Sequence, residues 1–202
     1  RALKDELGAC VSVDTRHAET ARRCLEAGAD VVNDVSALGD TEMGAVVAAA
    51  GAGLVLMHMR GTPATMQSLA VYRDVAAEVA AELAERLAAA RAAGVGEERI
   101  VLDPGVGFAK TGEQNVELIA GLEALVGLGR PVLLGPSRKA FIGALLGGVP
   151  AAERDAGTVG ACVAGLARGA RIFRVHGVAG ARQALDVAHA ILAHGRAGEA
   201  GA

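Results

Sequence analysis

The chain has 202 residues, of which 52% are hydrophobic, and its formal net charge at pH 7 is −3. This composition supplies enough apolar side chains for one core, and it lacks the basic excess that nucleic-acid-binding proteins show. Gly, Arg or Glu interrupts every apolar stretch well before about 18 residues, the length that a membrane span requires. We therefore expect a cytoplasmic protein that binds neither membranes nor nucleic acids.

Short apolar runs alternate along the chain with longer Ala-rich segments of helical period. Apolar runs of this length between helical segments are typical of parallel strands joined by helices. The pattern predicts six strands, at Cys10–Val13, Val31–Asn33, Leu54–Met57, Ile100–Leu102, Val132–Leu134 and Ile172–Val175. The chain is therefore expected to be a repeated series of β/α units.

The clearest predicted helix covers Asp74–Ala93, between the third and fourth strands. Apolar residues recur there at every fourth position, which places them on one helix face, and they are Val75, Val79, Leu83 and Leu87. Glu82 and Arg86 are also four residues apart, a spacing that favours an ion pair on the helix surface. We expect the apolar face to pack inward.

Each predicted strand is followed by polar residues at its C-terminal end. In a (β/α)8 barrel the C-terminal ends of all strands face one shared site, whereas an open doubly wound sheet concentrates them near one point. The sequence therefore favours an α/β fold of the (β/α)8 TIM-barrel type. Six units are two short of eight, and the chain opens with "RALKDELGA", so we interpret residues 1–202 as one domain that lacks its first two β/α units.

The first two strands end in carboxylate and amide side chains. "SVDT" places Asp14 after the first strand, where it could bind a donor-rich heterocycle or stabilise positive charge, or where it or Thr15 could cap a helix. "VVNDVSAL" places Asn33 and Asp34 after the second. An amide offers both a donor and an acceptor to the edge of a heterocyclic base, although Asn-Asp is also common in turns.

The strings "LMHMRGTPATMQ" and "LDPGVGFAK" follow the third and fourth strands. Met57 could pack its polarisable thioether against a flat ring. His58 could be a metal ligand or a hydrogen-bonded histidine at the rim, and the lack of a second ligand at metal spacing favours the latter. Asp103 and Phe108 flank two glycines that allow a ligand to approach the loop closely. Lys110 is interpreted as a solvated loop cation.

The last two strands lead into basic residues. "VLLGPSRKAF" contains Lys139, one of only three lysines beside 17 arginines, and a lysine retained in such a chain suggests that a compact ammonium on a flexible stem is required. "RVH" places Arg174 and His176 at alternating positions, so that both point the same way and could hold a phosphate or sulfate. Either residue alone could instead form a structural ion pair.

Taken in order, "SVDT", "NDVSAL", "LMHMRGTP", "LDPGVGFAK", "SRKAFIG" and "RVH" resemble the dihydropteroate synthase family over about Cys10 to Ile191. The resemblance implies a (β/α)8 barrel that condenses 6-hydroxymethyl-7,8-dihydropterin diphosphate with 4-aminobenzoate. The products are 7,8-dihydropteroate, an intermediate of folate biosynthesis, and diphosphate. It also implies that diphosphate departs largely before the amine attacks, that Mg²⁺ assists, and that the enzyme is a homodimer.

The same resemblance assigns roles to particular side chains. Asp14, Asn33 and Asp103 would bind the pterin ring, with Met57 packed near it. Lys139 would hydrogen-bond the pterin beside the 4-aminobenzoate pocket, with Phe108 on the wall of that pocket. Arg174 and His176 would hold the diphosphate. Asp14, Lys139, Arg174 and His176 would be the catalytic residues.

The chain departs from the family pattern in two respects. The "NxTxDSF" and "ESTRPG" loops of the family's first two strands are absent, and with them the expected Mg²⁺ ligand, so this chain is expected to contribute no metal ligand. Gly177 occupies a position that is commonly acidic in the family. These departures give some support to a non-catalytic pterin-binding paralogue. A pterin-dependent methyltransferase shares the barrel and some of the pterin contacts and is the other alternative, although its folate substrate leaves no diphosphate for "SRK" and "RVH" to bind.

Overall fold

The computed structural model describes residues 1–199 of the chain, and its side chains through residue 194. The C-terminal boundary of the predicted domain, at residue 202, lies outside the described residues. The strands are β1 (Ser12–Asp14), β2 (Val31–Asp34), β3 (Gly53–Met57), β4 (Ile100–Asp103), β5 (Leu133–Leu134) and β6 (Ile172–Phe173). The helices are α1 (Ala2–Asp5), α2 (Ala18–Glu26), α3 (Met43–Ala50), α4 (Val75–Ala92), α5 (Gly112–Ala120), α6 (Glu123–Val126), α7 (Ala140–Leu145), α8 (Asp155–Ala167) and α9 (Val178–Glu199), with 3-10 turns η1 (Met66–Leu69), η2 (Glu97–Arg99) and η3 (Ala151–Glu153).

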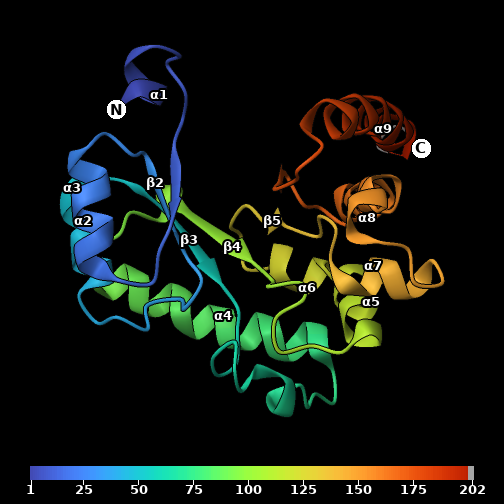
Figure 1. Ribbon diagram of the computed structural model, residues 1–202, viewed down its shortest axis with the longest axis horizontal. Coiled ribbons are helices and arrows are strands. Elements are labelled where there is room, and N and C mark those ends of the chain that lie inside the picture. Colours follow the sequence, from blue (N-terminus) through green and yellow to red (C-terminus); the bar gives the residue numbers. More distant parts are fainter. Residues whose placement is uncertain (200–202) are drawn as a thin grey trace.

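All six predicted strands are present, and they pair in parallel in the order of the sequence. Strands β1 to β4 form one sheet and β5 with β6 forms another. A parallel bridge between Leu102 and Val132 joins the two sheets, and the Leu102 N–H donates to the Pro131 carbonyl oxygen at 3.0 Å. The strands therefore form one arc, which is not closed into a full barrel, with α1 and α9 near its two ends (Figure 1).

Helix α4 confirms the periodic pattern of the sequence. The Asp74 side chain caps its first turn by accepting a hydrogen bond from the Ala77 N–H at 3.0 Å, which satisfies a backbone donor that has no partner within the helix. The four predicted apolar residues of this helix are buried. The predicted pair between Glu82 and Arg86 is wrong, because Glu82 instead contacts Arg60 and His58.

The hydrophobic core lies between the strands and the helices that cover the outer side of the arc. Strand residues with no exposed surface, including Leu54, Leu56 and Leu102, pack against buried residues of α4 and α5. Because both faces of a parallel sheet need cover, the polar side chains are displaced to the strand ends. The fold thus collects the chemically useful residues at the C-terminal ends of the strands.

Candidate functional site

Asp14 and Asn33 lie side by side at the ends of β1 and β2. The two residues are direct partners in the strand register, and the Asn33 Nδ2 atom donates a hydrogen bond to an Asp14 carboxylate oxygen. Asn33 is only 2% exposed, and its Oδ1 atom has no hydrogen-bond partner among the described residues. A buried acceptor without a partner is costly. Asn33 therefore presents an oxygen that a ligand N–H could satisfy.

Asp34, the neighbour of Asn33, has a different role. Its carboxylate accepts hydrogen bonds from the Ser36 N–H at 2.9 Å, the Ser36 hydroxyl at 2.6 Å and the Leu38 N–H at 2.7 Å. These contacts close the turn that follows β2. The turn chemistry expected of the Asn-Asp pair therefore belongs to Asp34, which leaves Asn33 available to a ligand.

Asp103 lies at the end of β4, opposite Met57 in the register of β3 and β4. Asp103 is 1% exposed, and burial raises the pKa of its carboxyl group, although the Arg174 guanidinium opposes that rise. Its Oδ1 atom accepts a hydrogen bond from the Gly105 N–H at 2.8 Å, and its Oδ2 atom lies 3.4 Å from Arg174 Nη2. The carboxylate is therefore held in one orientation.

Lys139 precedes α7 and leans over the loop that follows β4. Its ammonium nitrogen lies 4.1 Å from the centroid of the Phe108 ring, a cation-π geometry. A Cβ atom at Gly107 would lie 2.9 Å from Lys139 Cδ, so the absence of a side chain there makes room for the lysine stem. Burial, followed by the Arg174 charge, lowers the pKa of Lys139.

Arg174 and His176 lie just beyond β6, which ends at Phe173 rather than at the predicted Val175. They contact different partners, Arg174 reaching Asp103 and His176 reaching Ser137. The Ser137 hydroxyl oxygen accepts a hydrogen bond from the His176 N–H at 3.1 Å and lies 2.8 Å from Nδ1. If that hydroxyl donates to Nδ1, the proton of a neutral ring is on Nε2, which can then donate to an anion.

The neighbouring Arg138, in the "SRK" string, is occupied by the fold. Its guanidinium forms two hydrogen bonds of 2.7 Å with the Asp155 carboxylate, which ties the turn after β5 to α8. Such a bidentate pair fixes geometry as well as charge. Of the three consecutive residues in "SRK", Ser137 contacts His176 and Lys139 lies over Phe108. Arg138 holds the turn that carries both.

The expectation that Lys110 is a solvated cation is wrong. Lys110 is 3% exposed, and its ammonium nitrogen lies 3.0 Å from Nδ1 of His58. His58 is also buried, and its Nε2 atom lies 3.0 Å from Glu82. It is therefore a hydrogen-bonded histidine, buried rather than at the rim. In the described part of the chain, no group of three His, Cys, Asp or Glu residues could hold a metal ion.

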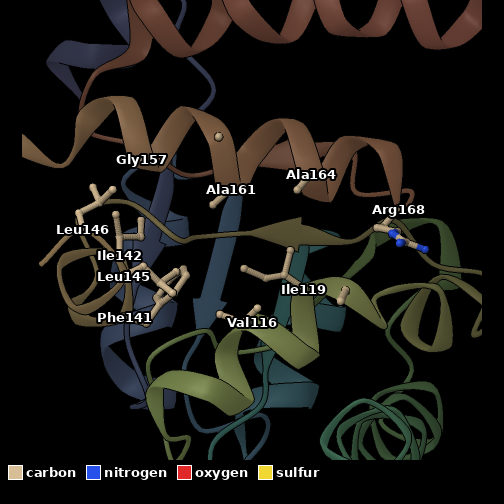
Figure 2. Close-up of a pocket in the computed structure, with 12 residues that line it drawn as sticks. Val116, Ile119, Phe141, Ile142, Leu145, Leu146, Gly157, Ala161, Ala164 and Arg168 are labelled. Atoms are coloured by element: carbon tan, nitrogen blue, oxygen red, sulfur yellow. The ribbon is translucent and has the colours of Figure 1, made fainter.

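A separate apolar groove of about 400 Å³ lies among α5, α7 and α8, and none of the predicted site residues line it (Figure 2). Figure 2 shows Ile119, Phe141, Leu145 and Leu146 directed toward it. Leu145 and Leu146 are exposed large hydrophobic residues. Such a patch is a common mark of an interaction surface, but it contains none of the polar groups of the cluster.

Comparison with known proteins gives consistent matches. Residues 1–176 match the family of pterin binding enzymes. A dihydropteroate synthase from Synechocystis sp. is 47% identical over 192 residues, which are 95% of this chain and 66% of that protein. A dihydropteroate synthase from Streptococcus pyogenes is 43% identical over 88% of this chain and 65% of its own length. The chain thus spans just under two thirds of these curated relatives.

Solved structures match as well. The dihydropteroate synthase from Thermus thermophilus in complex with 6HMPPP is 46% identical, with a TM-score of 0.87 over 92% of this chain and 73% of that one. The enzyme from Xanthomonas albilineans in complex with 7,8-dihydropteroate is 41% identical, with a TM-score of 0.87 over 94% of this chain and 71% of that one. These relatives are TIM barrels, so the arc corresponds to six units of a (β/α)8 barrel.

Proposed function

The chain belongs to the pterin-binding enzyme family, and from that premise we propose that it is part of a dihydropteroate synthase. The reaction joins 6-hydroxymethyl-7,8-dihydropterin diphosphate to 4-aminobenzoate and releases 7,8-dihydropteroate and diphosphate. The main support for this proposal is the cluster of Asp103, Lys139 and Arg174. In it, a buried carboxylate lies near two cations beyond the C-terminal ends of β4, β5 and β6.

The pterin ring is assigned to the ends of β1 to β4. Its amino group and ring N–H groups would donate to the carboxylates of Asp14 and Asp103 and to the Asn33 Oδ1 atom, which has no partner among the described residues. Met57 is buried beside Asp103 and would pack against the ring. Acceptors held by the fold before the ligand arrives need little reorganisation on binding.

The second substrate, 4-aminobenzoate, is assigned to the side of the cluster that Phe108 and Lys139 form. Phe108 supplies an aromatic face, and the ammonium of Lys139 lies above that face. A lysine stem fits along the space that Gly107 leaves open, from where its narrow head can donate to a ring carbonyl of the pterin. Lys139 would therefore contact the pterin at the boundary between the two substrates.

Diphosphate is assigned to Arg174 and His176. In the proposed reaction the bond between the pterin methylene carbon and the diphosphate oxygen breaks, and the electron pair leaves with diphosphate. The Arg174 guanidinium and the His176 ring N–H would bind the departing anion, while Asp14 stabilises the methylene cation electrostatically. The amine nitrogen of 4-aminobenzoate then bonds to the methylene carbon and releases a proton.

Mg²⁺ is proposed as a cofactor of the complete protein. The described residues provide no cluster that fits it, and the roles proposed for Asp14, Arg174 and His176 do not require it. We propose that the metal ligand is supplied by an N-terminal loop, and that the chain is one barrel domain lacking its first two β/α units.

A homodimer and a cytoplasmic location are further parts of the proposal. The groove of α5, α7 and α8 is a candidate surface for the homodimer, because large apolar side chains are exposed there. Among residues 1–199, no helix is long and apolar enough to cross a membrane. Sedimentation of the wild type and Leu145→Glu tests the dimer, since a charge in that groove should favour the monomer.

The activity is tested by incubating the full-length protein with both substrates and Mg²⁺, and by measuring dihydropteroate and diphosphate together. Equal amounts of the two products are expected. Binding of the pterin diphosphate without turnover would replace this proposal with a non-catalytic pterin-binding protein. Methyl transfer from a methylated reduced folate, without diphosphate release, would replace it with a methyltransferase.

A further inference from the structure

The loop between β4 and α5 carries much of the proposed site on a short piece of backbone. Asp103 begins the loop, Phe108 lies near its end, and the Lys139 stem passes Gly107 between them. A displacement of this backbone would therefore move a pterin contact and the wall of the aminobenzoate pocket together. Errors of about 1 Å in such positions can cost on the order of 100-fold in rate. The contacts that hold this loop therefore affect the positions of both proposed substrates.

The Lys110 side chain donates hydrogen bonds to the backbone of this loop. Its ammonium nitrogen lies 3.2 Å from the Gly105 carbonyl oxygen, 3.0 Å from the Phe108 carbonyl oxygen and 3.0 Å from Nδ1 of His58. A lysine ammonium has three N–H donors. All three donors of Lys110 can thus be used at once, two on the loop backbone and one on the side chain that follows β3.

His58 completes the arrangement as an acceptor. Its Nδ1 atom must accept from the Lys110 ammonium, which leaves the ring proton on Nε2, 3.0 Å from a Glu82 carboxylate oxygen. Burial and the neighbouring Lys110 charge lower the pKa of His58 to about 4, which favours this neutral ring. Glu82 is in turn paired with Arg60. Lys110 is thus anchored through a chain of side chains to α4.

The buried ammonium of Lys110 is not expected to add much to the stability of the fold. Among the described residues no carboxylate forms an ion pair with Lys110, and its three partners are neutral. Burial lowers its pKa to about 7, against the opposing effects of Asp103 and Glu82. Removing an ion from water costs several kcal/mol, and no carboxylate offsets that cost by pairing with this ammonium. The gain from this lysine therefore lies in where it holds the backbone.

From the three contacts of its ammonium, we infer that Lys110 is a positioning residue, which fixes the loop from Asp103 to Phe108 against His58 and thereby sets the pterin and aminobenzoate contacts. This inference deepens the proposed function and rests on it for its substrates. The hold on the loop is itself a property of the protein without substrate, and it can be measured separately.

The experiment compares wild type with Lys110→Met, which keeps an unbranched side chain, one atom shorter, and removes the three donors. In the full-length protein, we expect at least a tenfold weaker binding of the pterin diphosphate by calorimetry. The melting temperature should change little, because the cost of leaving three acceptors without a donor offsets the gain from removing a buried charge. Hydrogen exchange of the Gly105, Gly107 and Phe108 amides, without substrate, should accelerate at least tenfold.

Lys4→Met is the matched control, because it also removes a lysine. Lys4 pairs with Asp30 at 2.6 Å, far in sequence from the loop after β4, and its loss should change neither affinity nor exchange of the loop amides. Lys110→Gln retains donors that can reach part of the same set, so its loss of affinity should be smaller than that of Lys110→Met. If Lys110→Met does not fold, Lys110→Gln provides the same comparison.

A folded Lys110→Met with the affinity and loop exchange of wild type would overturn the inference. So would a loss of affinity that merely follows a fall in melting temperature, with exchange accelerated across the whole protein. Accelerated exchange confined to the loop supports the inference even if wild type does not bind the pterin diphosphate. In that case the proposed function fails and the role of Lys110 in holding the loop remains.

Discussion

The two sheets of the arc present different kinds of site. The sheet of β1 to β4 contributes two buried polar side chains to the site, with Asn33 at 2% and Asp103 at 1% exposure, whereas Asp14 at the end of β1 is exposed. Strand β6 leads into exposed Arg174 and His176, and the Arg174 side chain is 41% exposed, whereas Lys139 after β5 is half-buried. The two sheets are joined through the bridge at Leu102 and Val132, and Asp103 with Arg174 spans them at the site.

This difference reflects the two parts of the proposed substrate. A flat heterocycle is recognised by hydrogen-bond direction, and buried acceptors hold that direction because they cannot rotate toward water. A diphosphate is recognised largely by charge, and cations that stay hydrated until the ligand arrives avoid the cost of burial. Variants on the two sheets should therefore have separable effects on the two parts of the substrate.

Asp103→Asn should produce the largest loss. Replacing the carboxylate by an amide weakens two charge-assisted hydrogen bonds to the pterin, together worth about 3 kcal/mol, or on the order of 100-fold in affinity. Calorimetry should show this loss equally for the pterin diphosphate and the pterin alcohol. Asp186→Asn, at an exposed pair on α9, is the control. A loss limited to the diphosphate would show that Asp103 acts only through Arg174.

Arg174→Ala should weaken the pterin diphosphate by about 1.5 to 3 kcal/mol, because a charge-assisted contact to the anion is lost. The pterin alcohol has no diphosphate, so its affinity should barely change. Calorimetry of both ligands in the presence of Mg²⁺ measures this difference, and Arg168→Ala, on the outer helical layer, should leave both affinities intact. Equal losses for the two ligands would assign Arg174 to the support of Asp103 instead.

Lys139→Arg should lower turnover at least tenfold, about 1.4 kcal/mol, while the fold is retained. The planar guanidinium is wider than an ammonium and fits poorly between Phe108 and the pterin. Steady-state kinetics against Lys4→Arg as control measures the effect. Turnover at the wild-type level would show that this position requires only a positive charge, as we propose for Arg174.

Asp74→Ala should have the smallest effect and should not distinguish the two sheets. It removes the N-cap of α4, which is worth about 1 kcal/mol, and should lower the melting temperature by about 2 to 4 °C for a protein of this size. Calorimetric affinities for both pterin ligands should stay at wild-type values. A selective loss for either ligand would reveal that α4 transmits strain to the site through Glu82.

Local sequence patterns were sufficient to predict the six strands, helix α4 and the collection of polar groups at the strand ends. Each of these features depends on periodicity or on spacing within a few residues. The role of Lys139 in the site stays a prediction, which rests on the rarity of lysine in the chain and on its place in the loop after an apolar run. A barrel-type arc, rather than an open sheet, was also expected from the sequence, because polar residues follow every predicted strand.

Contacts between distant segments were not predictable in this way. Lys110 and His58 are 52 residues apart, so neither string alone indicates that the lysine is buried. Glu82 is closer in sequence to Arg86 but pairs with Arg60, 22 residues away. An exposed pair within a helix is worth a few tenths of a kcal/mol, which a partly buried network exceeds easily.

The close approach of Gly105 to His58 predicts how the loop tolerates substitution. A Cβ atom at Gly105 would collide with the His58 carbonyl oxygen, and its backbone φ of 68° is unfavourable for other residues. The collision involves backbone, so no change of rotamer could relieve it. In a library that samples all amino acids at each position of this loop, Gly105 should accept no replacement. Gly112, where a Cβ would meet nothing within 4 Å, should accept alanine.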